Sequence, residues 1–249
     1  MESLRKLRLI NRNNNALENN PLSIRIVLDR SGSMSGSQKV TMEALNTYLK
    51  ELKKEKGINA SITLSTFDSI SIDIPISKVL VKTLNSFPAD LLKPRGGTPL
   101  FDAIGLAIHD LENITETSDD DKVLVIVTDG FENASKEYTF ENISSKIKEK
   151  EEAGWLIIYL GADHDTFKQS NSLNFNRERS MKYSKKDSVD TFRAVTRTTL
   201  DYSKGMKSKD IKFTQQERIY SDKPSVEKFE DYFQADAHVK AYRKLEEEK

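Results

Sequence analysis

The chain has 249 residues, 37% of them hydrophobic and 31% charged, which is typical of a globular protein with a heavily solvated surface. The 39 Lys and Arg residues balance the 39 Asp and Glu residues, so net charge gives no reason to expect binding to nucleic acid or to an anionic membrane. The absence of cysteine excludes disulfides, zinc–thiolate sites and catalytic thiols, and it fits a reducing compartment.

The first 20 residues are polar and rich in Asn, and we expect them to form an arm that ends at Pro21. They contain no apolar stretch of about 7–15 residues, so we expect no secretory signal. No part of the chain has the ~20 apolar residues that span a bilayer. The expected location is therefore the cytoplasm.

Strands and helices alternate along the next part of the chain, as judged from the spacing of apolar residues. In chain order we expect a strand over 22–28, a helix over 39–56, two hairpin strands over 59–67 and 70–77 with their turn at Asp68-Ser69, a short helix and loop over 79–94, a helix over 100–113, a buried strand over 123–128, a helix over 140–153, a second buried strand over 155–161, an edge strand over 174–183 and a helix over 188–202.

This alternation predicts one α/β domain over 21–204 with a mostly parallel sheet. The two fully apolar strands, VLVIV and WLIIYL, are expected at the centre of the sheet, where helices cover both faces. Residues 205–249 break the alternation. We expect this extension to be partly helical, either packed on the domain or docking a partner.

Oxygen-bearing side chains follow two of the predicted strands and precede one helix. They are Asp29, Ser31 and Ser33 in DRSGS, Thr98 in PRGGTPL and Asp129 in TDGFEN. Ligands of open α/β sheets bind beyond the carboxyl ends of the strands. Alternate residues of an extended segment face the same way, so we expect the first three to share one target. Glycines permit tight bends beside them: Gly32, Gly96, Gly97 and Gly130.

The chemistry of this set favours a hard divalent cation. It offers carboxylates and hydroxyls but no imidazole or sulfur, a combination that suits Mg²⁺, with Mn²⁺ or Ca²⁺ as alternatives. Two carboxylates only just neutralise a divalent ion, and five side chains leave one of six positions of Mg²⁺ open. The bound ion would therefore accept an anionic oxygen from outside.

The motif Asp-x-Ser-x-Ser, followed by the Thr of GGTPL and the Asp of VTDG, resembles the metal-ion-dependent adhesion site of von Willebrand factor A domains. The likeness covers roughly residues 22–204, and no position of the motif is missing. The YLGADHD stretch over 159–165 is similar to a bacterial and phage-type intracellular branch.

The resemblance implies a Rossmann-like, doubly wound sheet with one antiparallel edge strand and helices on both faces. It implies that Ser31 and Ser33 bind the ion directly, while Thr98 and the two aspartates switch between direct and water-mediated contact as the domain opens and closes. The free metal position would take a Glu or Asp of a partner protein. Asp102, Gly32, Gly97 and Gly130 would support these ligands from behind, and no catalysis is expected.

Two other classes of function stay open. A metal-dependent hydrolase or phosphatase would use Ser31 or Ser33 as the nucleophile, His164 as the base and an aspartate to orient it. DRSGS is not the Gly-x-Ser-x-Gly elbow of hydrolases. A structural subunit of a larger assembly, for instance a viral one, would make its contacts through residues 205–249.

Overall fold

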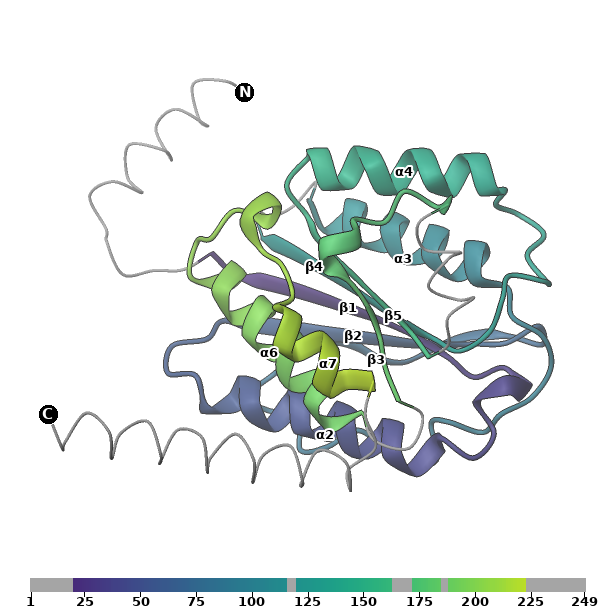
Figure 1. Ribbon diagram of the computed structural model, residues 1–249, viewed down its shortest axis with the longest axis horizontal. Helices are drawn as coiled ribbons and strands as arrows, with labels where there is room; N and C mark the ends of the chain where they lie inside the picture. The colour runs from purple at the N-terminus through teal and green to yellow at the C-terminus, as the bar shows by residue number, and fades with distance from the viewer. Residues whose placement is uncertain (1–19, 116–119, 163–171, 185–187, 223–249) are drawn as a thin grey trace, which may run out of the picture.

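The computed structural model describes residues 20–115, 120–162, 172–184 and 188–222 (Figure 1). Its elements are β1 (Leu22–Asp29), the 3₁₀ turn η1 (Gly32–Met34), α2 (Gln38–Lys54), β2 (Ala60–Phe67), β3 (Ile72–Leu80), α3 (Leu100–Thr115), β4 (Asp121–Thr128), α4 (Phe140–Glu152), β5 (Leu156–Gly161), the 3₁₀ turn η2 (Arg177–Arg179), β6 (Ser180–Lys182), α6 (Val189–Ser203), the 3₁₀ turn η3 (Ser208–Asp210) and α7 (Gln215–Asp222).

The strands form one six-stranded sheet in the order β3-β2-β1-β4-β5-β6. The β2–β3 pair is antiparallel, and each of the other neighbouring pairs is parallel. The predicted α/β fold, mostly parallel with one antiparallel edge strand, is confirmed. The chain moves outward from β1 to β2 and β3, and then returns through α3 to β4 on the other side of β1.

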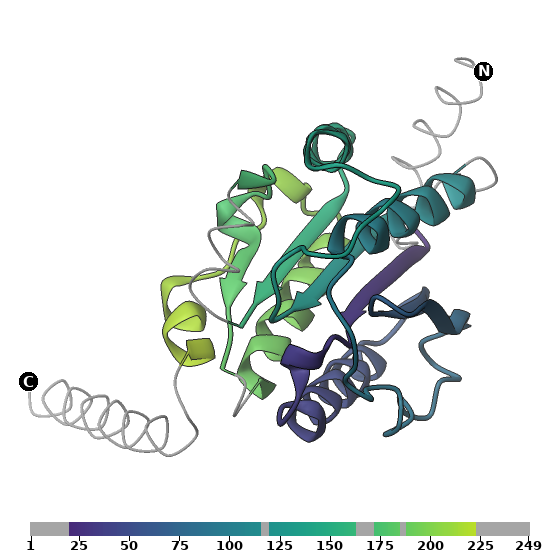
Figure 2. The same ribbon diagram turned by 90° about the vertical axis from the view of Figure 1, so that its right-hand side faces the viewer.

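Helices cover both faces of the sheet, and each face has its own core. In β1, Ile24, Ile26 and Leu28 point to the core that α2 and α6 share, whereas Val27 points to the core under α3 and α4. Figures 1 and 2 show α3 and α4 on one side of the sheet and α2, α6 and α7 on the other. Period-two alternation in a strand covered on both faces explains this division.

Three predictions need correction. The hairpin connection spans residues 68–71 rather than a two-residue turn, because the Asp68 carboxylate accepts hydrogen bonds from the amides of Ile70 and Ser71. Residues 79–80 continue β3, and 81–94 form turns and loop rather than a short helix. Only residues 180–182 of the predicted edge strand over 174–183 form β6.

The segment after α6 packs back onto the domain as far as the structure describes it. Helix α7 contacts α6 and β6, and Arg218 donates hydrogen bonds to the carbonyl oxygens of Arg177, Glu178 and Ser180. Residues 1–19 of the predicted arm over 1–20, His164 and residues 223–249 of the extension lie outside the described residues. Within the described ranges, no helix has the length and apolarity needed to cross a membrane.

Candidate metal site

The candidate site lies at the carboxyl ends of β1 and β4. These strands are parallel neighbours, and the chain leaves them toward opposite edges of the sheet. Asp29 is the last residue of β1, and Asp129 follows the last residue of β4. Such a switch point is where open α/β sheets bind their ligands.

The loop after β1 holds Asp29, Ser31 and Ser33 close together. The Asp29 side chain is fully buried. Its Oδ1 accepts a 2.7 Å hydrogen bond from the amide of Ser31, and the hydroxyls of Ser31 and Ser33 lie 2.8 Å apart. The prediction of an extended loop is wrong for its second half, because the 3₁₀ turn η1 begins at Gly32. The turn nevertheless keeps the two hydroxyls within hydrogen-bond distance.

The side chain of Thr98 and the loop after β1 come together beside Gly130. A Cβ atom built on Gly130 would lie 2.6 Å from Thr98 Oγ1, 3.1 Å from Ser33 Oγ and 3.5 Å from Asp29 Oδ2. Three of the five predicted oxygen ligands, two from the loop after β1 and one from the segment before α3, therefore approach one point. Only glycine leaves that point free of side-chain atoms.

The two aspartates interact electrostatically. Burial raises the pKa of the Asp29 carboxyl above its usual value, hydrogen bonds donated by Thr128 and Ser31 act to lower it, and the Asp129 carboxylate raises it further. The Thr128 bond, from Oγ1 to Asp29 Oδ2, is 2.6 Å long. A bound cation would remove this repulsion between two buried like charges.

The other predicted glycines sit where backbones approach each other. The amide of Gly32 donates a 3.0 Å hydrogen bond to the carbonyl oxygen of Gly96, which ties the first motif to the second. A Cβ on Gly97 would lie 2.6 Å from Asn133 Oδ1. Asn133 Oδ1 also accepts a 2.8 Å hydrogen bond from the amide of Thr98, so Gly97 gives Asn133 the room to hold Thr98.

Asp102 fixes the loop that follows β4. Its carboxylate accepts hydrogen bonds from the amides of Lys136, Glu137 and Tyr138, at 2.8, 3.0 and 2.9 Å. In return, Glu132 accepts a 2.8 Å hydrogen bond from the amide of Phe101 in the first turn of α3. Asp102 thus acts on the site by holding the loop that carries Asn133 against the start of α3.

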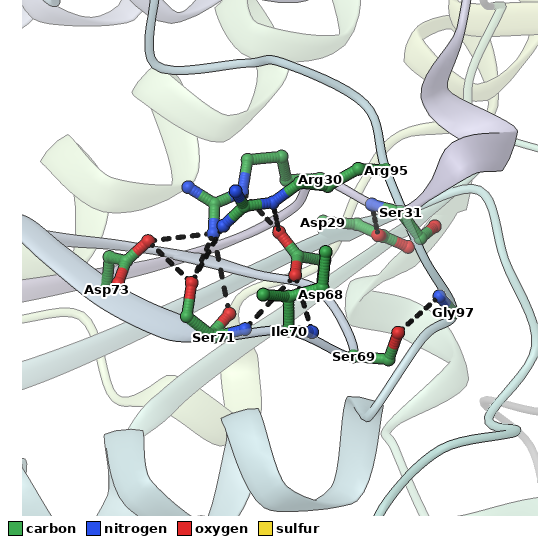
Figure 3. A network of polar contacts seen from close by, with 10 residues as sticks. All are labelled: Asp29, Arg30, Ser31, Asp68, Ser69, Ile70, Ser71, Asp73, Arg95 and Gly97. Atoms are coloured by element: carbon green, nitrogen blue, oxygen red, sulfur yellow. Dashed lines mark hydrogen bonds and ion pairs between the residues drawn. The ribbon is translucent and has the colours of Figure 1, made fainter.

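A second buried aspartate, Asp68, lies beside the site (Figure 3). Its Oδ2 accepts hydrogen bonds from Nε of Arg30 at 2.6 Å and from Nε of Arg95 at 2.8 Å. Arg30 belongs to the first motif, and Arg95 precedes Thr98 by three residues. One carboxylate therefore ties both metal-site loops to the turn between β2 and β3.

Neighbouring polar groups extend this connection. Ser69 accepts a 2.8 Å hydrogen bond from the amide of Gly97, and its own amide donates a 3.0 Å bond back to the Gly97 carbonyl oxygen. Arg30 also pairs with the carboxylate of Asp73 at 2.8 Å. These contacts leave the turn over 68–71 attached at two places to the segment that carries Thr98.

Sequence reasoning missed Thr128, Asn133, Asp68 and the two arginines as parts of the site. Thr128 and Asn133 stand inside the TDGFEN segment, so their position next to Asp129 was a usable signal. The Asp68 contacts join residues 27 to 38 positions apart, and nothing in the local sequence indicates them.

The donor set fits a hard cation. No group of three or more His, Cys, Asp or Glu side chains in the described part of the chain could hold a metal ion, so hydroxyl oxygens would have to complete any shell here. Carboxylate and hydroxyl oxygens suit Mg²⁺, Mn²⁺ or Ca²⁺ rather than Zn²⁺ or Cu²⁺. Asp29, Ser31, Ser33, Thr98 and Asp129 are the residues that could supply them.

Comparison with solved structures gives the fold. No protein-family model and no curated protein sequence matches the chain. Among solved structures, the open conformation of the pilus adhesin SpaC from Lactobacillus rhamnosus GG matches 74% of this chain and 30% of its own, with a TM-score of 0.55 and 15% identity.

Two further structures agree. The vWF domain of the type V pili tip protein Mfa5 from Porphyromonas gingivalis matches 72% of this chain and 95% of its own, with a TM-score of 0.53 and 13% identity. A von Willebrand factor type A protein from Catenulispora acidiphila matches 73% and 43%, with a TM-score of 0.52 and 16% identity. The chain therefore has the fold of von Willebrand factor A domains, and it spans less than half of the SpaC and Catenulispora chains.

Proposed function

We propose that the chain is a protein-interaction module in which a divalent cation, Mg²⁺ in the first instance, coordinates a Glu or Asp carboxylate of a partner protein. Asp29, Ser31, Ser33, Thr98 and Asp129 would hold the ion. The observation that supports this most is the approach of the Thr98, Ser33 and Asp29 oxygens to one point beside Gly130.

Charge is the reason to expect an anionic partner. The two protein carboxylates cancel the charge of a divalent ion without exceeding it, and the three hydroxyls add none. The ion would therefore keep a strong attraction for another anionic oxygen. Ser33 is exposed whereas Asp29 and Thr98 are buried, so a partner would reach the ion from the side of η1.

Exposed apolar side chains beside the site offer a second kind of contact. Ile70, in the turn that Asp68 holds, is 68% exposed, and Phe131, next to Gly130, is 47% exposed. A carboxylate alone would give little specificity. An acidic residue with an apolar neighbour would bind the ion and cover one of these side chains at the same time.

The hydrolase alternative has less support. His164, its predicted base, lies outside the described residues. The one histidine within the described residues is His109, which is exposed on α3 and contacts Asn113. The Ser31 hydroxyl lies 2.8 Å from the Ser33 hydroxyl, which is no general base, and the carboxylate with which it also hydrogen-bonds is that of Asp29, which we assign to the ion. We propose a binding function without turnover, in the cytoplasm, as the lack of cysteine and the resemblance to the intracellular branch suggest.

The direct test uses metal-dependent peptide selection. Random peptides displayed on phage would be captured on the immobilised full chain in millimolar Mg²⁺ and eluted with EDTA. We expect enrichment of peptides with Asp or Glu next to an apolar residue. Replacing that Asp or Glu by its amide should abolish binding, which is measured by fluorescence anisotropy.

The variant for comparison is Ser33→Ala, which removes one proposed ligand hydroxyl that is exposed and leaves the core intact. It should lose the EDTA-eluted peptides. Selection of the same peptides by Ser33→Ala, or by the wild type in EDTA, would show that the ion plays no part. Phosphate release from p-nitrophenyl phosphate that disappears in Ser33→Ala would favour the hydrolase alternative.

A further inference from the structure

Arg25 is a buried charge at the middle of β1, away from the candidate metal site. It is 1% exposed and shares the sheet face of Val27, under α3. Its Nη2 lies 2.8 Å from Oδ2 of Asp110 on α3. Its Nε and Nη1 atoms are buried and have no hydrogen-bond partner among the described residues.

An arrangement of this kind is unusual and costly. Buried polar groups in folded proteins are nearly always hydrogen-bonded, and those that are not commonly mark a place for a water molecule, an ion or a ligand. Burial lowers the pKa of Arg25 more than the charge of Asp110 raises it. One carboxylate, itself partly exposed, therefore compensates the buried charge incompletely.

Arg25 lines a pocket of about 260 Å³ between β1, β2, β3 and the end of α3. Hydroxyl groups dominate its polar lining. In the parallel register Arg25 pairs with Thr63 and Ser23 pairs with Ser61, which places these polar residues together on one sheet face. The residues that matter to the inference are Arg25, Ser61, Thr63, Ser77, Lys78 and Asp110.

The pocket wall contains an irregular segment of β3. The β2–β3 register shifts between Ile62 and Leu64, and Lys78 adopts a φ of 51°, a left-handed conformation that is uncommon outside glycine. The amide of Lys78 donates a 3.0 Å hydrogen bond to Thr63 Oγ1. Because that oxygen accepts this bond, its own O–H remains able to donate to a ligand.

We propose that this pocket is an anion site for a small oxyanion of the phosphate class, bound by the guanidinium of Arg25 and by the hydroxyls of β2. Arg25 and Lys78 outnumber Asp110 in charge, so the pocket carries a net positive charge. A guanidinium presents a planar set of donors that matches two oxygens of a phosphate or a carboxylate. A water molecule would satisfy the donors but would leave the net positive charge of the pocket unbalanced.

The test is binding of inorganic phosphate to the full chain in EDTA, so that the candidate metal site does not contribute. Acetate and chloride at equal ionic strength are the comparison anions. We expect phosphate to raise the unfolding temperature and to shift backbone amide NMR signals of residues 23–25, 61–63 and 77–78. Acetate giving the same shifts with higher affinity would replace the phosphate class by a carboxylate ligand.

Three pocket variants and one control variant refine the test. Arg25→Met keeps the apolar stem and should weaken phosphate binding at least tenfold, whereas the exposed Arg193→Met on the other sheet face should not change it. Asp110→Asn removes the competing carboxylate and should tighten binding severalfold. Thr63→Val should weaken binding without removing charge.

Circular dichroism shows whether Arg25→Met folds. If it does not fold, the phosphate affinities of Asp110→Asn and Thr63→Val test the proposal in its place. Unchanged binding in Thr63→Val together with weaker binding in Asp110→Asn would overturn the proposal. So would phosphate-induced signals confined to residues 29–33 and 129–133, or no response to phosphate in the wild type.

Discussion

Asp29 and Asp68 are two buried aspartates at the same end of the sheet, and their surroundings differ in one respect. The Asp68 carboxylate contacts the guanidinium groups of Arg30 and Arg95. In the part of the chain that the structure describes, no arginine or lysine pairs with Asp29, whose charged neighbour is another carboxylate. The protein itself neutralises one of these aspartates, whereas the other has no basic partner among the described residues, as the proposed cation site requires.

The pKa directions express this difference. Burial acts to raise the pKa of Asp68, but hydrogen bonds from Arg95, from the amides of Ile70 and Ser71 and from Arg30 bring it below its usual value. Burial raises the pKa of Asp29, and its hydrogen bonds do not reverse that. Asp68 is thus suited to hold the loops together, and Asp29 is suited to bind a divalent ion.

Removing the Asp29 carboxylate should have the largest effect on metal binding. Asp29→Ala takes away one of two charged ligands, so its loss of Mg²⁺ affinity should exceed the roughly 10–100-fold typical of groups behind the ligands. Isothermal titration calorimetry measures it. Because Asp29 is buried beside Asp129, Asp29→Ala should fold without metal at least as readily as the wild type. Retained Mg²⁺ affinity would mean that Asp29 is not a ligand.

Removing the Asp68 charge should affect stability more than Mg²⁺ affinity, which is the reverse of what we expect for Asp29→Ala. Asp68→Asn leaves the buried Arg30 with Asp73 as its remaining charged partner, so the free energy of unfolding should fall by about 3 kcal/mol, while Mg²⁺ affinity falls about tenfold through looser loops. Asp73→Asn is the matched control, since it breaks a half-exposed pair with the same arginine and should cost less than about 1 kcal/mol. Urea unfolding distinguishes them, and equal losses would contradict the structural role of Asp68.

Thr128 tests how the Asp29 carboxylate is oriented. Thr128→Val keeps the volume but removes the hydroxyl that donates to Asp29 Oδ2, and Mg²⁺ affinity should fall about tenfold. Thr128→Ser retains a hydroxyl and should restore most of the affinity. Calorimetry on both variants checks this, and an equal loss in both would point to packing rather than to the hydrogen bond.

Lowering the pH should reduce the free energy of unfolding more in the wild type than in the Asp68→Asn variant. Because the folded pKa of Asp68 lies below its unfolded value, its contribution to stability is present above the usual carboxyl pKa of 3.8 and is lost as the pH falls through the folded pKa. The wild type should therefore lose more stability than Asp68→Asn between about pH 4 and about pH 2. Parallel curves of unfolding free energy against pH would contradict this.

The sequence was informative where patterns are local. Apolar runs such as 123–127 predicted the central strands, because a strand covered on both faces needs no polar alternation. The three oxygen-bearing segments could be placed at one end of the sheet because each adjoins a predicted element. The contacts of Asp68 could not be predicted, since they depend on how separate loops fold against one another. The pocket beside Arg25 depends on the β2–β3 register and on the uncovered part of one sheet face, which apolar spacing does not specify.

Manganese binding in crystals of the full chain tests the central claim most directly. Mn²⁺ can replace Mg²⁺ at an oxygen site. Its anomalous scattering locates the ion independently of which residues are proposed as ligands. We predict a single strong anomalous peak bounded by Thr98 Oγ1, Ser33 Oγ and a carboxylate oxygen of Asp29, and no peak there in crystals of Asp29→Ala. Crystals grown in millimolar Mn²⁺ that show no peak at this position, or the same peak in the variant, would contradict the account.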